Sequence, residues 1–108
     1  MLNTLKTAIE SRTPVKFHYI KPGKDPGERI GNPHAIYIGE TPEGEKSTKV
    51  DMVQTGGVSD SQKPFPSWRT FDINELTNIV LSESSTPFEI YHFYNPTSER
   101  YDSVVKKV

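Results

Sequence analysis

The sequence predicts a small single domain that is mainly β, a partly open barrel of five short strands with a helix at each end. Its length of 108 residues suits one domain with one modest hydrophobic core. Nine prolines and seven glycines argue against long helices. Between these turn residues lie five stretches in which apolar and polar residues alternate, and such alternation is typical of strands with one buried face.

A short helix is expected at residues 2–11. Leu2, Leu5 and Ile9 recur at intervals of three and four residues and form an apolar stripe along it. Pro14 ends the helix, because a proline disfavours the helical conformation of the residue before it.

The five strands are expected at residues 15–20, 29–39, 47–55, 68–73 and 77–81. In the first of them, alternation predicts that Val15, Phe17 and Tyr19 face the core. The second is expected to bend near Pro33, which lacks a backbone donor and therefore suits a bulge or an edge. Residues 56–67 form a long loop of the kind that often carries function.

An aromatic-rich stretch at residues 88–94 is expected either to pack across the barrel or to form a partner surface. Asn95 followed by Pro96 is typical of a helix start, with Asn as the cap and Pro at the first position. A short C-terminal helix is therefore predicted to run through Val104 and Val105.

The net charge of −1 argues against a strong non-specific binder of duplex nucleic acid, which normally carries a basic excess. Residues 1–30 nevertheless hold six basic and three acidic groups, which is either a locally positive face or a chance asymmetry of the solvated surface. The absence of cysteine excludes disulfides and thiolate metal sites. No segment has the length of a membrane span or the pattern of a signal peptide, so we expect a cytoplasmic protein with no membrane partner.

Motifs for catalysis are missing. The chain has no nucleophile elbow, no phosphate-binding glycine loop and no dinucleotide fingerprint, so neither an enzyme nor a cofactor is expected. His18, His34 and His92 lack the close spacing of metal ligands, so no metal site is expected. Asp51 and Asp72 alternate with apolar neighbours, which is ordinary for exposed strand faces.

Several short motifs occur in a definite order along residues 2–96. They are Ala8-Ile9 followed by Arg12, Val15-x-Phe17-x-Tyr19, Arg29-Ile30-x-x-Pro33-His34, Gln54-x-x-Gly57, Trp68-Arg69-x-Phe71, Ile79 and Tyr94-Asn95-Pro96. This order resembles the WYL domain family, in particular its small stand-alone members. The chain lacks the Trp-Tyr-Leu tripeptide that names the family, and 108 residues leave no room for the helix-turn-helix domain of the larger members.

The resemblance implies an Sm-like β-barrel that acts as a non-catalytic regulatory module. Its ligand would be a nucleotide, a single-stranded nucleic acid or another anionic molecule, and any DNA binding would come from a partner. The alternative is a protein-interaction or assembly module, a homodimer included, that uses a sheet edge and the aromatic stretch at residues 88–94.

The candidate ligand-binding residues are Arg29, His34, Tyr37, Gln54, Trp68 and Arg69. Arg29 and Arg69 match arginines of the family pattern. They form either an anion-binding pair, since a guanidinium suits phosphate, or salt bridges across the sheet or solvated groups at strand ends. His34 either donates a hydrogen bond to a ligand or bonds to the backbone of its own turn.

The aromatic candidates and Gln54 also have two interpretations. Tyr37 and Trp68 can stack on bases, as aromatic residues do in single-strand binders. Trp68 lies on the strand face opposite to Phe71, so it can instead pack beneath its own loop or beneath the C-terminal aromatic residues. Gln54 either reads a base edge or bonds to the backbone of the loop that follows it.

Overall fold

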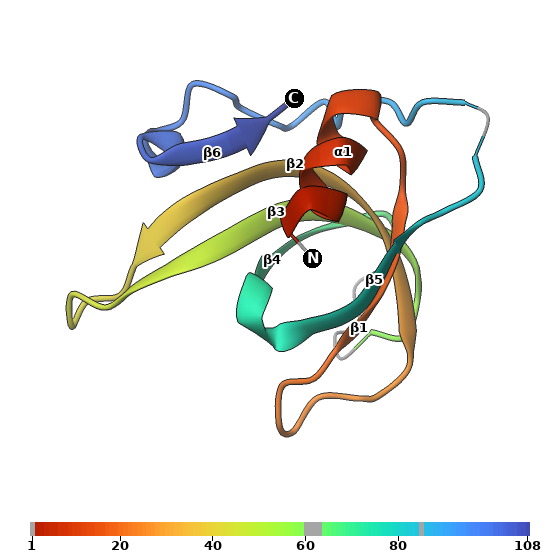
Figure 1. The fold of residues 1–108 in the computed structure, drawn as a ribbon, viewed down its shortest axis with the longest axis horizontal. Coiled ribbons are helices and arrows are strands. Elements are labelled where there is room, and N and C mark those ends of the chain that lie inside the picture. The colour runs from red at the N-terminus through yellow and green to blue at the C-terminus, as the bar shows by residue number, and fades with distance from the viewer. Residues whose placement is uncertain (1, 60–63, 85) are drawn as a thin grey trace.

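Two long antiparallel strands, β2 and β3, run through the middle of the computed structural model, which describes residues 2–59, 64–84 and 86–108 (Figure 1). The elements in chain order are α1 (Leu2–Ser11), β1 (Val15–Tyr19), β2 (Glu28–Glu40), β3 (Lys46–Gly57), β4 (Ser67–Asp72), the 3-10 helix η1 (Ile73–Glu75), β5 (Leu76–Leu81), the 3-10 helix η2 (Glu99–Tyr101) and β6 (Val104–Lys107). The prediction of a mainly β fold behind an N-terminal helix is confirmed. Residues 60–63 of the long loop predicted at 56–67 lie outside the described residues.

The strands form one antiparallel sheet whose main path has the order β4-β3-β2-β1-β5. The two ends of this path, β4 and β5, are joined in the chain only by η1. Because three residues span a short distance, the sheet must curl until these two edges approach each other at that point. Among the described residues, no ladder joins β4 to β5, so the curled sheet is not closed into a hydrogen-bonded barrel.

The N-terminal helix covers the residues that the apolar stripe predicted, and its buried side chains are Leu5, Ala8 and Ile9. Its end is fixed by two backbone bonds, from Thr13 N–H to the Ala8 carbonyl at 2.9 Å and from Arg12 N–H to the Ile9 carbonyl at 3.3 Å. This is the Schellman arrangement, in which the residue after the helix adopts a left-handed conformation. Arg12 occupies that position with φ 51°.

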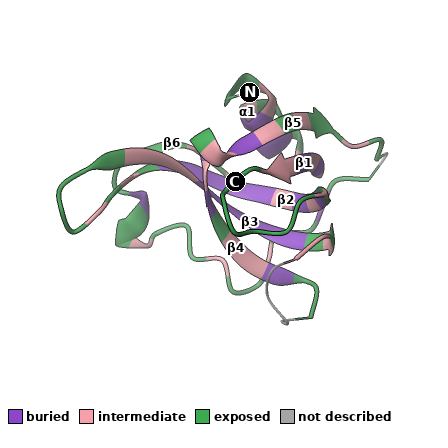
Figure 2. Ribbon diagram, turned by 90° about the horizontal axis from the view of Figure 1, so that it is seen from below, coloured by how far each residue is buried: buried purple, intermediate pink, exposed green. Residues whose placement is uncertain are grey.

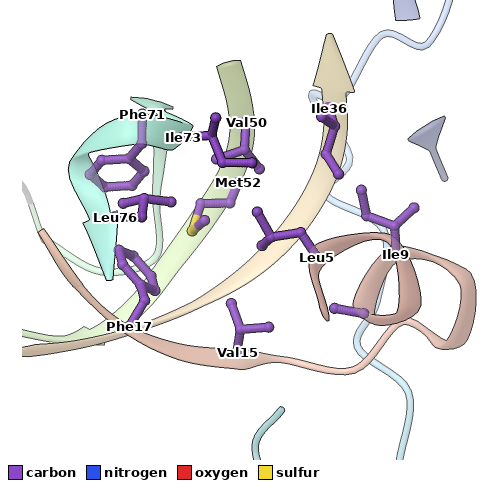
Figure 3. Close-up of a cluster of buried hydrophobic side chains, with 11 residues drawn as sticks. Leu5, Ile9, Val15, Phe17, Ile36, Val50, Met52, Phe71, Ile73 and Leu76 are labelled. Carbon is purple, nitrogen blue, oxygen red and sulfur yellow. The ribbon is translucent and has the colours of Figure 1, made fainter. Parts of the chain in front are cut away.

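The concave face of the curled sheet, here called the inner face, meets α1 and holds the main hydrophobic core (Figure 3). The core side chains come from α1 and from every strand of the main path. They are Leu5, Ala8, Ile9, Val15, Phe17, Ile36, Val50, Met52, Phe71, Ile73 and Leu76. Phe17 and Phe71 meet edge to face with ring centroids 5.3 Å apart. This contact joins β1 to β4 across the concave side, as expected for a curled sheet.

The predicted C-terminal helix is wrong, because Val104 and Val105 belong to the sixth strand, β6. β-branched residues favour strands. The edge of β2 is open at this point, since β1 pairs only with residues 28–31 of β2 and leaves Ala35–Tyr37 for β6. Asn95 starts a turn instead, in which its side-chain oxygen accepts from Thr97 N–H at 3.1 Å.

The convex face of β2, β3 and β4, here called the outer face, is covered by residues 86–108, the C-terminal segment. Consecutive residues of the middle strands are therefore buried, as the purple stretches of β2 and β3 in Figure 2 show, and consecutive strand residues point to opposite faces. A second, smaller cluster of Ala35, Tyr37, Tyr94 and Tyr101 occupies the outer side. Within the described residues, no helix is long and apolar enough to cross a lipid bilayer.

Candidate functional site

The six candidate residues lie on two opposite faces of the sheet and do not form one pocket. Arg29 is paired with Phe17 in the β1–β2 ladder, and Arg69 with Met52 in the β3–β4 ladder. Phe17 and Met52 belong to the inner core, and directly opposed residues of a ladder point to the same face. Trp68 alternates with Arg69 and therefore points outward.

The candidates on the inner face, Arg29, Gln54 and Arg69, bond to neighbouring parts of the chain. Gln54 is fully buried, and its side-chain amide donates to the carbonyls of Gly56 at 3.1 Å and Val58 at 2.7 Å. The side chain thus holds the loop backbone, which was one of its two interpretations.

The two arginines are engaged as well. Arg69 donates from Nε to the Ser67 hydroxyl at 3.0 Å and from Nη2 to the Ser59 hydroxyl at 2.7 Å. Arg29 is only 1% exposed and lies with its guanidinium carbon 5.1 Å from the centre of the Tyr19 ring. A ligand therefore reaches Arg29 only if the surrounding turns move.

His34 is a fully buried structural residue on the outer side. One ring nitrogen, Nδ1, lies 2.8 Å from the Asn32 carbonyl, and the other, Nε2, lies 3.0 Å from the backbone N–H of Tyr91. A carbonyl only accepts and an N–H only donates, so the ring is neutral with its proton on Nδ1. Burial lowers the pKa of His34 below its ordinary value, in agreement with this state. The backbone-bonding interpretation of His34 fits these contacts.

Trp68 packs beneath the C-terminal aromatic residues. Its ring stacks on Tyr91 with the centroids 5.8 Å apart and an interplanar angle of 19°, and it meets the His34 ring in a T-shaped contact at 5.6 Å. Phe88 stacks on His34 with the centroids 5.1 Å apart. Part of the aromatic stretch at 88–94 therefore packs on the sheet, whereas Phe93 remains 74% exposed.

Tyr37 belongs to a buried polar network that the sequence did not reveal. Asp51 is fully buried, which corrects the expectation that it lies on an exposed strand face. Its Oδ1 accepts from the hydroxyls of Tyr37 at 3.0 Å and Thr70 at 2.6 Å, and its Oδ2 accepts from the Tyr101 hydroxyl at 2.7 Å. Arg100 lies against the same carboxylate, with Nε 3.1 Å from Oδ2 and Nη2 3.2 Å from Oδ1.

The direction of each hydrogen bond in this network is determined, and the Tyr37 and Thr70 hydroxyls both donate to Asp51 and accept from Arg100. Burial raises the pKa of the Tyr37 and Tyr101 hydroxyls, so both stay protonated and act as donors at neutral pH. Arg100 binds Asp51 through its Nε–Nη2 edge, and Nη2 also lies 2.8 Å from the Tyr37 hydroxyl. Since a guanidinium is planar, its orientation is fixed by these contacts. Within the described residues, no hydrogen bond involves the third nitrogen, Nη1.

A cavity of about 500 Å³ opens beside this guanidinium at the hairpin end of the outer face. Its lining residues are Tyr37, Ile38, Gly39, Glu40, Lys49, Thr70, Glu99 and Arg100. This volume lies inside the range of roughly 300–1,000 Å³ that is usual for small-ligand pockets. The side chain of Arg100 is 45% exposed, and Lys49 is 29% exposed with its ammonium 3.4 Å from Asp72. We call this cavity the Arg100 cavity.

The charges of the residues that line the Arg100 cavity are balanced, and each of the two cations also pairs with a carboxylate outside the lining, Arg100 with Asp51 and Lys49 with Asp72. Arg100 and Lys49 supply two cationic groups, and Glu40 and Glu99 supply two carboxylates. No group of three or more His, Cys, Asp or Glu side chains suited to a metal ion occurs in the described residues. The arrangement can therefore bind an anionic group at the guanidinium while it disfavours a large polyanion.

Comparisons of the chain with protein-family models, with curated proteins and with solved structures gave no match. The resemblance to WYL domains therefore rests on the residues quoted for it, and the function has to be inferred from the site itself.

Proposed function

We propose that this protein is a non-catalytic binding module for a small ligand with one anionic group, such as a carboxylate or a single phosphate, and that the ligand binds in the Arg100 cavity. The observation that carries this proposal is the attachment of Arg100 to the buried carboxylate of Asp51 through one edge of its guanidinium. The remaining nitrogen is left for a ligand, at the wall of a cavity that Lys49 also lines.

Preorganisation is what makes this guanidinium suitable. Ordering a free arginine side chain costs up to about 2 kcal/mol of conformational entropy, which normally reduces the affinity of an anion site. Here the contacts with Asp51, Tyr37 and Thr70 already hold Arg100 in place. An anion that binds it therefore does not have to order the side chain, and its hydrogen bonds are charge-assisted.

The charge balance selects the class of ligand. Glu40 and Glu99 line the same cavity, so each further negative charge on a ligand meets repulsion. This favours a compact ligand over the oligonucleotide that the family resemblance also allows. The contacts of Arg29 and Arg69 with neighbouring parts of the chain support an anion contact at Arg100 and Lys49 in place of the predicted arginine pair.

The finer architecture is part of the same proposal. A curled path of five strands behind an N-terminal helix supports the Sm-like architecture implied by the WYL resemblance. Because the sequence carries no catalytic motif, we propose binding and not catalysis at this site. The role would be regulatory if a partner protein distinguishes the ligand-bound from the ligand-free state.

The test is equilibrium binding of inorganic phosphate, adenosine monophosphate and oligothymidylate at about 50 and 200 mM salt. We expect the wild type to bind the two small anions and to bind oligothymidylate more weakly. Lys49→Ala removes one cation while leaving the network of Asp51 intact, so it should weaken binding about tenfold, as expected for the loss of a charge-assisted contact. Lys24→Ala, in the exposed turn before β2, is the matched control and should bind as the wild type does.

Three results contradict the proposal. The first is that the wild type binds neither small anion. The second is that Lys49→Ala binds as tightly as the wild type while its circular dichroism is unchanged. The third is that Arg69→Ala alone abolishes binding, which would place the site on the inner face.

A further inference from the structure

A second cavity opens at the other end of the outer face and has a different character. Its volume is about 230 Å³, and its lining residues are Asn32, Val53, Thr55, Pro66, Glu89, Ile90, Tyr91 and His92. Apolar side chains beside it are unusually exposed for their type, with Ile90 at 48%, Phe93 at 74% and Phe65 at 38%. We call this cavity with its exposed rim the aromatic groove.

We propose that the aromatic groove binds an extended, proline-containing segment of a protein partner that carries a lysine or arginine beside the proline. This binding is separate from the small-anion site of the Arg100 cavity, since the two cavities share no lining residue.

Size separates a peptide from a small-molecule ligand. The volume of about 230 Å³ is below the usual range for small-ligand pockets, roughly 300–1,000 Å³. A space of this size holds one or two side chains of a peptide whose backbone stays at the surface. Such shallow occupancy, with apolar contacts repeated along an extended chain, is typical of peptide grooves.

The rings of the groove form a wall that is held in place. Tyr91 stacks on Trp68 with an interplanar angle of 19°, and its backbone N–H is fixed to Nε2 of His34 at 3.0 Å. His92 and Phe93 continue the aromatic surface, with their ring centroids 4.1 Å apart. Rigid aromatic surfaces recognise proline-rich chains because a polyproline helix is already ordered before it binds.

Charge distinguishes a peptide from a nucleic acid, which also stacks on aromatic rings. Among the described residues that line the cavity, Glu89 is the one charged side chain besides the titratable His92, and none is a lysine or arginine. A phosphate backbone would meet the Glu89 carboxylate without a compensating cation from these residues. A lysine or arginine next to the proline would pair with that carboxylate, so the charge favours a basic, proline-containing peptide.

The direct test is a titration of the full chain with an oligoproline flanked by lysines. Binding is monitored through the fluorescence of Trp68, whose ring stacks on Tyr91. We expect a saturable change in Trp68 fluorescence with this peptide. The same peptide with alanine in place of proline, and oligothymidylate, should leave the Trp68 fluorescence unchanged. Phe93→Ser changes an exposed ring and should weaken binding at least about tenfold without affecting the fold. Glu89→Lys should weaken binding of the lysine-flanked peptide and strengthen that of a glutamate-flanked one.

Controls separate this proposal from the alternatives. Val80→Ser removes a similarly exposed apolar side chain on β5 and should bind the peptide as the wild type does. Lys49→Ala should also bind the peptide as the wild type does. The result of this test therefore does not depend on whether the Arg100 cavity binds an anion. The proposal fails if no peptide binds or if oligothymidylate changes the Trp68 fluorescence instead. It also fails if Phe93→Ser only converts a sedimenting dimer into a monomer, because the occupant is then a second copy.

Discussion

At the scale of single residues, Asp51 is the group on which the outer face depends. A buried carboxylate is costly unless it is paired and fully hydrogen-bonded. Asp51 meets that condition with three hydroxyl donors and one guanidinium, which come from β2, β4 and the C-terminal segment. The same network therefore connects the cover of the sheet to its middle strands and positions Arg100 at the proposed ligand site.

We expect Asp51→Ala to lower the free energy of unfolding by about 3 kcal/mol, the lower end of the range for breaking a buried pair, because Arg100 can still reach water. Asp72→Ala is the control, since Asp72 pairs with Lys49 at a partly exposed position and caps η1. Its cost should be about 1 kcal/mol. Urea unfolding monitored by circular dichroism measures the free energy of unfolding of both variants. Equal losses would show that the Asp51 network contributes no more to stability than the partly exposed pair of Asp72.

The sequence could not locate this site, and the reason is physical. Alternation tells which residues of a strand share a face, but it does not tell whether a second layer covers that face. Tyr37 was a candidate, whereas Asp51 was assigned to an exposed face. One signal was available, because Val53 shares the face of Asp51 and is apolar. Arg100 lies 49 residues away from Asp51, and no local pattern connects the two.

At the scale of elements, the local signals worked where a local cause determines the structure. The apolar stripe and Pro14 gave α1 with its observed bounds, and the bend expected near Pro33 is a register shift between Pro33 and Ala35. The prediction failed at β6, where the decisive factor was not local. The open edge of β2 offered backbone partners to the last residues, and a strand could satisfy them whereas a helix could not.

A pair of glycines tests how closely β2 and β3 approach. Gly57 and Gly23 have nearly the same left-handed φ, 84° and 83°, so an alanine suffers similar backbone strain at both. A Cβ at Gly57 would overlap the Glu28 carbonyl oxygen and lie 2.7 Å from the Cα of Arg29, whereas a Cβ at Gly23 meets nothing within 4 Å. We expect Gly23→Ala to cost about 1 kcal/mol and Gly57→Ala about 2–4 kcal/mol, since overlap adds to the strain.

Thermal or urea unfolding of the two variants measures this difference directly. Because both positions have nearly the same φ, the backbone strain cancels when the two variants are compared. The remaining difference in unfolding free energy reports the contact between the end of β3 and the start of β2. If the two alanine variants are equally stable, the strands separate at this point and the close approach does not contribute to stability.

At the scale of the whole molecule, the sheet separates two layers of different composition. The inner layer is built around the apolar core and includes α1, whereas the outer layer depends on aromatic stacking and on the hydrogen bonds of a buried carboxylate. Both proposed binding sites lie at the outer layer, one at each end of the outer face, and the C-terminal segment contributes residues to both. Because polar contacts hold this segment, we expect it to respond to solution conditions more readily than the inner core.

His34 makes this response dependent on pH. Its Nε2 accepts a hydrogen bond from Tyr91 N–H, and protonation would turn that acceptor into a donor facing another donor. Burial is the largest effect on the pKa of His34 and lowers it, whereas the hydrogen bond with the Asn32 carbonyl and the charge of Asp51 on β3 favour the charged ring. The rings around it are neutral, and Glu89 and His92 are the charged or titratable side chains of the segment next to Tyr91.

The sign of the pH effect follows from that lowered pKa. In the unfolded chain His34 titrates near its ordinary value of about 6.5, so below this pH the unfolded state binds a proton that the folded state excludes. The stability that His34 contributes is complete above about pH 6.5 and is lost as the pH falls below that value toward the folded pKa. Glu10, whose pKa is lowered by Lys106, loses its contribution only in the more acidic range of carboxylates.

We therefore expect the midpoint of urea unfolding to fall between about pH 8 and pH 5 in the wild type, and to fall less in His34→Gln, which cannot titrate. The variant should be less stable than the wild type at pH 8, because the amide does not reproduce the aromatic stacking of the ring on Phe88. Hydrogen exchange should show the Tyr91 amide opening first as the pH falls, ahead of the amides of β2 and β3. Parallel pH profiles for the two proteins would mean that the ring of His34 does not control the attachment of the C-terminal segment.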